Sequence, residues 1–116
     1  MNQLVKDLKA IKKLLRSRRR WTQGLGARDR LGREVSAVSR SAVCWCLDGA
    51  AMKVTRYPMF QRRFVLRYEA VREAFGIAAR THYYVVWNDQ RDRKHADVLA
   101  MLDRAIKRAM KRTVKS

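Results

Sequence analysis

A stretch with almost no charge lies near the middle of this highly charged chain. Residues 41–52 contain one charged side chain, Asp48, although 33% of all residues are charged. The stretch is too long for an ordinary strand, and its apolar residues fall on several helical faces. We therefore predict a helix over residues 41–54 that is buried on most sides, with Ser39 or Ser41 as its N-cap. Small residues at positions 49–51 would let another backbone come close.

Apolar residues at helical spacing predict one helix at each end of the chain. In residues 4–16 they recur every three or four positions, and Asn2 is a candidate N-cap. In residues 94–112 a similar apolar line is flanked by further apolar residues, which make the apolar face of this helix wider, and Asp92 is a candidate N-cap. The members of the two lines are Leu4, Leu8, Ile11 and Leu15 in the first, and Val98, Leu102, Ala105 and Ala109 in the second.

Two more elements are predicted between the central stretch and the last helix. Residues 59–75 form a helix that starts after Pro58 and is stopped by Gly76. Its aromatic residues share one stripe, which we expect to lie in the core. Residues 82–87, HYYVVW, are β-branched and aromatic and therefore predict a short strand.

A short hairpin is predicted at residues 27–35, where Gly32 would supply the positive φ of the turn. The strand at residues 82–87 could pair with it. The chain thus predicts a single α+β domain over residues 1–116, mostly helical, with about four helices and a small antiparallel sheet.

The charge of the chain is extreme and concentrated at its ends. Twenty-eight basic and ten acidic residues give a net charge of +18. The basic terminal segments, residues 1–20 and 101–116, have net charges of +7 and +5 and so hold +12 of that total. Such an excess indicates a polyanionic partner, with nucleic acid first and an anionic membrane surface second.

The candidate nucleic-acid-binding residues lie in these two segments. Four arginines fall within residues 16–20, which exceeds what the dipole of a helix end requires. Basic residues of the last helix recur every three or four positions, opposite its apolar face. If the two helices pack side by side, their basic ridges would form one stripe suited to a phosphate backbone. The candidates are Lys6, Lys9, Lys13, Arg16, Arg18, Arg19, Arg20, Arg104, Lys107, Arg108, Lys111, Arg112 and Lys115.

The same sequence argues against several other classes of protein. No run approaches the roughly 18 apolar residues of a membrane span, and lysines interrupt the apolar residues that a signal peptide would need. Cys44 and Cys46 would point about 200° apart on the predicted helix and could not bridge, which fits a reducing cytoplasm. Because His82 and His95 are isolated in sequence, we expect no metal site, no cofactor and no catalytic residue.

Four polar residues leave two interpretations open. Arg28, Asp29, Asn88 and Asp89 could form a functional site. The favoured interpretation is that they are a salt bridge and a turn that clamp the hairpin to the last helix.

Several short motifs follow one another in a fixed order along the chain. They are Trp21, Gly24, Ala27-Arg28-Asp29, Gly32, Ala42, Trp45-Cys46-Leu47, Gly49-Ala50, Trp87-Asn88-Asp89, Val98-Leu99 and Leu102-Asp103-Arg104-Ala105-Ile106. This series of landmarks resembles a family of small domains of unknown function from phages and bacteria. The resemblance covers roughly residues 21–106, implies no activity, and points to a phage origin. The dense basic ends look like departures from it.

Two functional hypotheses follow. The first is a non-enzymatic nucleic-acid-binding accessory protein of a phage or mobile element, which grips the phosphate backbone of DNA or RNA largely without reading sequence. The alternative is a small phage inhibitor that binds a host defence protein through its basic surface. An adapter on an acidic membrane surface is a more distant third hypothesis.

Overall fold

Five α-helices, one 3-10 turn and a two-stranded sheet form residues 2–57 and 61–115, the part of the chain that this computed structural model describes. The mostly helical α+β arrangement confirms the predicted fold class, with one helix more than the expected four. The elements are α1 Gln3–Leu14, η1 Arg18–Arg20, β1 Ala27–Arg28, β2 Cys44–Trp45, α2 Leu47–Thr55, α3 Arg62–Ala79, α4 Tyr84–Asp89 and α5 His95–Lys115.

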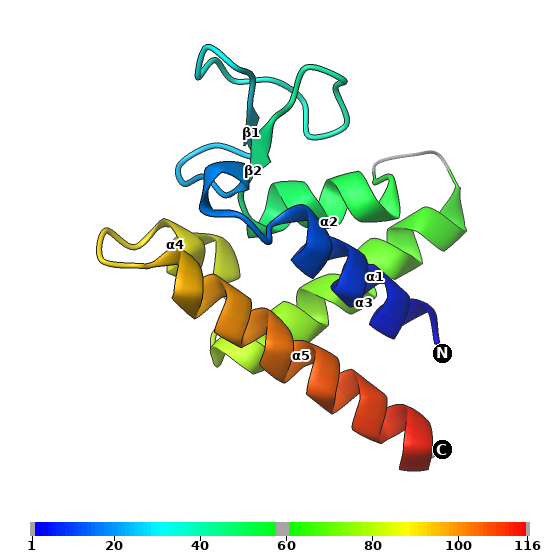
Figure 1. Cartoon of the computed structure of the whole chain (residues 1–116). Coiled ribbons are helices and arrows are strands. Elements are labelled where there is room, and N and C mark those ends of the chain that lie inside the picture. The colour runs from blue at the N-terminus through cyan, green and yellow to red at the C-terminus, as the bar shows by residue number, and fades with distance from the viewer. Residues whose placement is uncertain (1, 58–60, 116) are drawn as a thin grey trace.

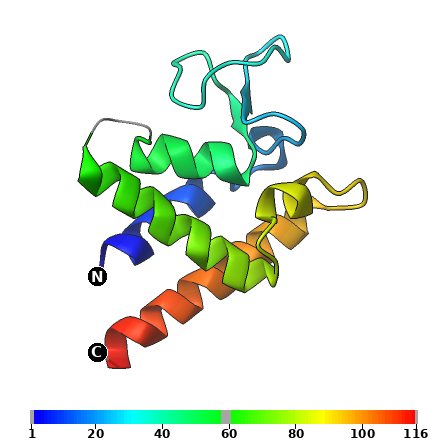
Figure 2. The same ribbon diagram turned by 180° about the vertical axis from the view of Figure 1, so that it is seen from behind.

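α3 contacts each of the other four helices, and α1 contacts α2, α3 and α5. Figures 1 and 2 show the strands and their loops at one end of the molecule, and the two termini together away from them. α1 begins as predicted, because the side-chain oxygen of Asn2 accepts a hydrogen bond from the backbone N–H of Val5 at 2.8 Å. Val5, Leu8 and Ile11 bury the apolar side of this helix in the core.

α2 begins at Leu47, later than predicted. Cys44 and Trp45 form strand β2, and Cys46 is the N-cap of the helix. The sulfur of Cys46 accepts a hydrogen bond from the backbone N–H of Gly49 at 3.2 Å. A strand and a helix therefore follow each other inside one apolar stretch, and hydrophobic periodicity cannot separate two such elements.

The two serines that were predicted as caps lie in the loop before β2. The hydroxyl oxygens of Ser39 and Ser41 are 2.8 Å apart, and neither caps α2. The same loop is fastened to the sheet by Trp45, whose indole N–H donates to the carbonyl oxygen of Ala37 at 2.9 Å.

The predicted hairpin is confirmed, although its partner strand is not the one expected. Gly32 has φ +80° in the turn, and Arg28 and Glu34 form an antiparallel bridge. β1 then pairs antiparallel with β2, with Ala27 opposite Trp45.

α3 continues through Gly76, which was predicted to stop it, and ends at Ala79. Its C-cap, Arg80, is in the left-handed conformation with φ 59°. Gly76 has another role. The backbone N–H of Thr81 donates to its carbonyl oxygen at 2.9 Å, and a Cβ at this position would lie 3.1 Å from the carbonyl oxygen of Thr81. The chain therefore folds back closely over Gly76. Pro58 and the predicted start of this helix at residue 59 lie outside the described residues.

The aromatic stripe of α3 is in the core, as expected. Its described members are all buried, and they are Phe64, Tyr68, Val71 and Phe75.

Residues 82–87, predicted as a strand, contribute instead to helix α4. Tyr84 and Asn88 are four residues apart and both buried, whereas Val85 and Val86 between them are exposed. That pattern is helical, so the core contacts of this segment override its β-propensity.

α5 begins at His95, and Asp92 is not its cap. The carboxylate of Asp97 accepts a hydrogen bond from the backbone N–H of Lys94 at 2.9 Å and so satisfies one of the free donors at the start of the helix. The predicted apolar line is buried in the core, and its members are Val98, Leu102, Ala105 and Ala109.

Gly49 of α2 lies directly against the backbone of the loop before β1. A Cβ at this position would be 1.9 Å from the carbonyl oxygen of Gly26. The same carbonyl accepts a hydrogen bond from the backbone N–H of Cys46 at 3.1 Å. This confirms the close backbone approach expected at residues 49–51.

Gly49→Ala should destabilise the fold, because the added methyl would collide with a backbone oxygen that is already held in place. We expect the free energy of unfolding in urea to fall by at least about 2 kcal/mol, within the range for overpacked cores. Gly26→Ala is the matched control, since a Cβ there meets no atom within 4 Å, and it should stay within about 0.5 kcal/mol of wild type. Equal losses in the two variants would contradict the close approach.

Candidate nucleic-acid interface

The two basic ends of the chain meet where α1 and α5 pack against each other in opposite directions. At the start of α5, the Nε2–H of His95 donates to the carbonyl oxygen of Leu15 at 2.6 Å. Further along, the ammonium of Lys12 pairs with the carboxylate of Asp103. Both termini lie at the same end of the molecule (Figure 1). The fold thus brings together the two segments that hold most of the net charge.

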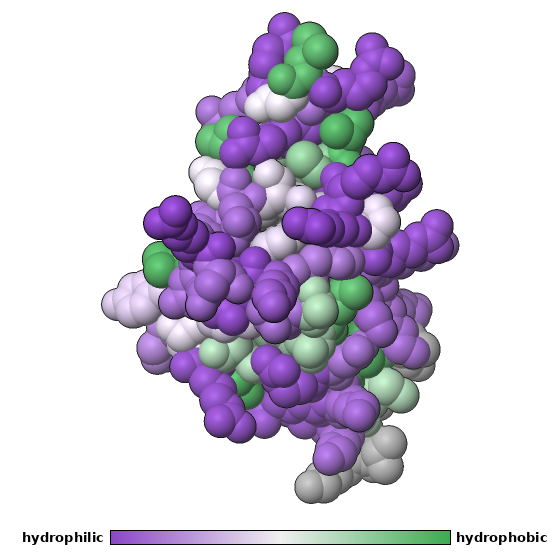
Figure 3. Space-filling model, turned by 60° about the vertical axis from the view of Figure 1, so that its left-hand side comes forward, coloured by the Kyte–Doolittle hydropathy of each residue, from purple (hydrophilic) through white to green (hydrophobic). Residues whose placement is uncertain are grey.

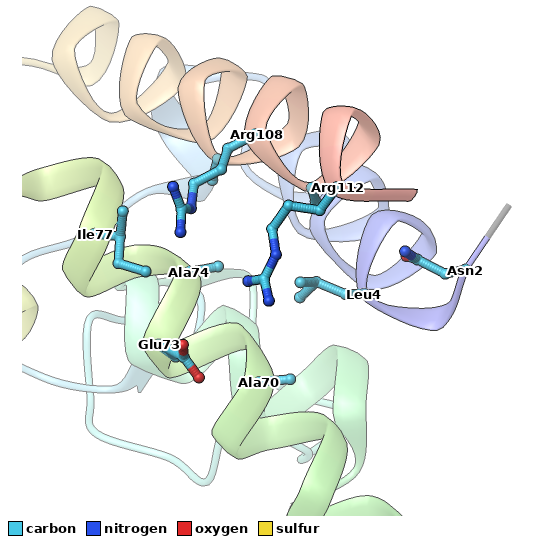
Figure 4. A pocket seen from close by; sticks show the side chains of 10 residues that line it. Asn2, Leu4, Ala70, Glu73, Ala74, Ile77, Arg108 and Arg112 are labelled. Carbon is cyan, nitrogen blue, oxygen red and sulfur yellow. The ribbon is translucent and has the colours of Figure 1, made fainter. Parts of the chain in front are cut away.

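The basic ridge predicted on α5 divides into two lines. Arg104, Arg108 and Arg112 are four residues apart and so follow one line. Arg104 donates from Nε and Nη2 to the carbonyl oxygen of Ala78, near the end of α3, at 3.2 and 3.1 Å. Arg108 and Arg112 extend over a groove of about 410 Å³ between α5 and α3, opposite Glu73 (Figure 4). The arginine line therefore borders α3.

The lysine line borders α1. Lys107 and Lys111 lie four and eight residues after Asp103, and Asp103 pairs with Lys12 of α1. Side chains at this spacing share one helix face. Lys107 and Lys111 therefore continue along α5 from the point where the two helices are joined. The side chain of Lys115 lies outside the described part of the structure.

The candidate residues of the N-terminal segment are exposed. Those on or directly after α1 are Lys6, Lys9, Lys13 and Arg16, and those of η1 are Arg18, Arg19 and Arg20. Four ion pairs are found among the described residues, and none uses a predicted nucleic-acid-binding side chain. Hydrophilic side chains cover most of the face in Figure 3, where hydrophobic ones form separate patches. These cations are thus accessible to an external anion.

A second basic cluster was missed from the sequence. It lines a pocket of about 390 Å³ between η1 and the start of α5. The available signal was the run of basic residues at positions 91–95, interrupted once by Asp92. The pocket is lined by Arg18, Trp21, Arg93, Lys94, His95 and Ala96.

A polar cluster joins α2, α3 and α4 on another side of the molecule. The hydroxyls of Tyr68 and Tyr84 both donate to Oδ1 of Asp48 at 2.6 Å, and Nε of Arg72 donates to the Tyr84 oxygen at 3.0 Å. Burial, together with the hydrogen bonds to Asp48, raises the pKa of both phenols. The phenols thus remain neutral donors, which suits a structural joint between three helices.

Arg28 and Asp29 hold the hairpin together. The guanidinium of Arg28 donates to the hydroxyl of Thr22 and to the carbonyl oxygens of Gln23 and Gly32, at 2.9 to 3.2 Å. Asp29 pairs with Arg33 at 2.9 Å, and the backbone N–H of Arg33 lowers the pKa of this carboxyl.

Asn88 and Asp89 clamp the segment before the hairpin to α4, not to the last helix as the clamp hypothesis proposed. The Asn88 amide donates to the carbonyl oxygen of Thr22 at 3.2 Å, and Asp89 accepts from the backbone N–H of Gly24 at 3.0 Å. All four of these polar residues therefore have structural partners.

The cysteines do not lie on one helix, so the angular argument about them is wrong. Cys44 is in β2, Cys46 caps α2, and both are free thiols. Burial raises the pKa of the Cys46 thiol. Within residues 2–57 and 61–115, no three His, Cys, Asp or Glu side chains are grouped as metal ligands, and no helix combines the length and apolarity of a membrane span.

Comparison with known protein families matches most of this sequence to one of them. The sequence pattern of a family of unknown function, DUF6197, matches residues 1–108. The chain belongs to this family. The comparisons with curated proteins and with solved structures found no match.

The DUF6197 match extends further than the landmarks suggested. It begins at residue 1 and ends at residue 108, so it includes the whole N-terminal basic segment and every element from α1 through most of α5. Lys111 and Arg112 lie beyond it. Because the function of the family is unknown, membership in it assigns no activity to this chain.

The buried phenols predict a loss of stability in alkali. The folded DUF6197 domain holds the protons of Tyr68 and Tyr84 more tightly than the unfolded chain, in which the pKa of tyrosine is near 10. The two tyrosines therefore make their full contribution to the free energy of unfolding below about pH 10, and this contribution is lost as the pH rises above that value. Tyr84→Phe should reduce the fall in unfolding free energy between about pH 9 and pH 11, measured by urea denaturation.

Tyr83→Phe is the matched control, because that ring is 72% exposed. Its pH dependence should follow that of wild type. If the unfolding free energy of Tyr84→Phe falls with rising pH as steeply as that of Tyr83→Phe, the buried phenols are not the cause of the loss of stability in alkali.

Proposed function

We propose that this protein is a non-enzymatic nucleic-acid-binding accessory protein of a phage or mobile element, acting in the host cytoplasm. It grips phosphates through the basic surface formed by α1, η1 and α5. The single observation that carries the proposal is the antiparallel packing of α1 and α5, which sets α1 alongside α5 and η1 beside the start of α5, while the candidate cations from Lys6 to Arg112 stay exposed.

Phosphate backbones suit such a surface for an electrostatic reason. Each phosphate contact releases condensed counterions, so many accessible cations give binding that is strong at low salt and nearly independent of base sequence. The lysine line of α5 and the lysines of α1 are supported on helices. Helical support keeps several ammonium groups at regular spacing on the surface.

Salt dependence tests the proposal directly. Fluorescence anisotropy on a labelled random duplex should show log K falling with log salt at a slope of about −0.9 per phosphate contact. Six contacts would weaken binding about a thousandfold between about 50 and 200 mM salt. Replacing Arg16, Arg18, Arg19 and Arg20 by Gln should flatten the slope and weaken binding to all sequences alike.

The lysine line of α5 offers a smaller and better-matched change. The double variant Lys107→Gln/Lys111→Gln should reduce the magnitude of the slope by about 1.8, the value for two contacts. Arg30→Gln/Arg40→Gln removes the same charge from exposed loop positions next to the sheet and should change the slope much less. Equal effects of the two double variants would mean that net charge matters and that the α1–α5 surface does not.

A protein partner is the second candidate, namely a host defence protein bound by a small inhibitor. Apolar side chains exposed at and before α4 favour it, since Tyr83 is 72% exposed and Val86 is 61% exposed. A flat salt response and micromolar or weaker duplex binding, in protein shown to be folded by circular dichroism, would remove the first proposal and favour this one.

A further inference from the structure

The pocket between η1 and the start of α5 combines several cations with an aromatic wall. Arg18, Arg93, Lys94 and His95 contribute basic groups, Trp21 contributes an indole ring, and no acidic residue lines the pocket. Its volume of about 390 Å³ falls in the range of small-ligand sites, about 300–1,000 Å³. It therefore offers both charge and a flat apolar surface to one ligand.

The aromatic wall is held in one orientation. The indole N–H of Trp21 donates to the side-chain oxygen of Asn88 at 2.8 Å, and its backbone forms a parallel bridge with Trp45. The ring centroid of His95 lies 6.2 Å from that of Trp21, and the Nε2–H of His95 is bound to the carbonyl oxygen of Leu15. A ring fixed at both its edge and its backbone loses little freedom when a ligand stacks on it.

The basic groups are of two kinds. Arg93 is held over the ring of Trp87 at 3.8 Å and donates to the carbonyl oxygen of that residue at 2.9 Å, while Asp97 lies 4.0 Å away. The side chains of Arg18 and Lys94 make no hydrogen bond or ion pair with the rest of the described chain. These two therefore keep their donors for an anion.

We propose that this pocket binds an unpaired nucleotide of single-stranded nucleic acid, with its base stacked on Trp21 and its phosphate held by Arg18 and Lys94. The inference rests on the proposed function and adds a preference to it. A free phosphate has no use for the indole, and paired bases in a duplex have no free face to stack on it. Unpaired bases stack well on aromatic side chains, regardless of their identity.

Two variants at Trp21 isolate the stacking. Trp21→Phe and Trp21→Leu both lose the N–H that binds Asn88, so they share the loss of this hydrogen bond, but only Phe keeps an aromatic face. With a labelled oligothymidylate, the Leu variant should bind about fivefold or more weaker than the Phe variant, as expected for one stacked base. With a duplex of equal length, the two variants should bind equally.

The duplex measurement separates the two proposals. Equal oligothymidylate binding by the two variants, with duplex binding and its salt dependence intact, would overturn the pocket and leave the proposed function standing. Absence of duplex and single-strand binding in the folded wild-type protein would overturn both.

The phosphate contact is tested by a charge-matched pair. Lys94→Gln removes one positive charge from the pocket, whereas Arg40→Gln removes one exposed positive charge from a loop outside the pocket. Lys94→Gln should reduce the preference for single strand over duplex, and Arg40→Gln should leave that preference unchanged. If the two variants prefer single strand over duplex to the same degree, Lys94 does not hold the phosphate of the stacked nucleotide.

Small ligands test the pocket without a nucleic-acid polymer. In nuclear magnetic resonance spectra, thymidine monophosphate should shift the indole N–H signal of Trp21, which is identified by its loss in Trp21→Phe. Thymidine and inorganic phosphate should each shift it less. An equal shift with inorganic phosphate alone would show a simple anion site and overturn the stacking.

Discussion

The buried side chain of Asn88 is the interaction on which the arrangement of this small protein depends. Its Oδ1 accepts from the indole N–H of Trp21 at 2.8 Å and from the backbone N–H of Leu47 at 3.2 Å. Its Nδ2 donates to the carbonyl oxygen of Thr22 and to the carboxylate of Asp89. Leaving such a buried group unpaired costs about 1–3 kcal/mol. α4, the start of α2 and the segment after η1 therefore meet in a single geometry in which every polar atom of the amide is satisfied.

This joint also determines how the basic segments are presented. From Asn88 a short loop leads to α5, and Arg93 fastens that loop by donating to the carbonyl oxygen of Trp87. His95 then binds the carbonyl oxygen of Leu15, at the end of α1. The direction of α5 relative to α1 is thus set near the joint. Because both helices are amphipathic, burying their apolar faces leaves the basic ones facing solvent. The proposed interface is therefore a consequence of the core.

The two end helices could be predicted from the sequence because their local pattern and their burial agree. The line of residues from Leu4 to Leu15 has the period of a helix, and the same line faces the core. Helix α4 could not be predicted, because its β-branched and aromatic residues favour a strand, whereas Tyr84 and Asn88 are buried by contacts with distant segments. The candidate cations at the termini could be identified by counting charges along the sequence. The pocket could not be identified in this way, since Trp21 and Lys94 are far apart in sequence and are brought together only by folding.

The use of the acidic residues explains why so much positive charge stays uncompensated. Six of the ten carboxylates bind groups within the fold, and they are Asp7, Asp29, Asp48, Asp89, Asp97 and Asp103. Asp7, in the N-terminal segment, is buried and pairs with Arg67 of α3, which turns it away from the surrounding lysines. Such carboxylates stabilise helix ends, turns and helix contacts but neutralise little of the surface. The remaining positive charges repel one another, and a net charge far from zero weakens the compact state. A polyanion bound along α1 and α5 would relieve that repulsion, so the same charge that weakens the free domain would favour its complex.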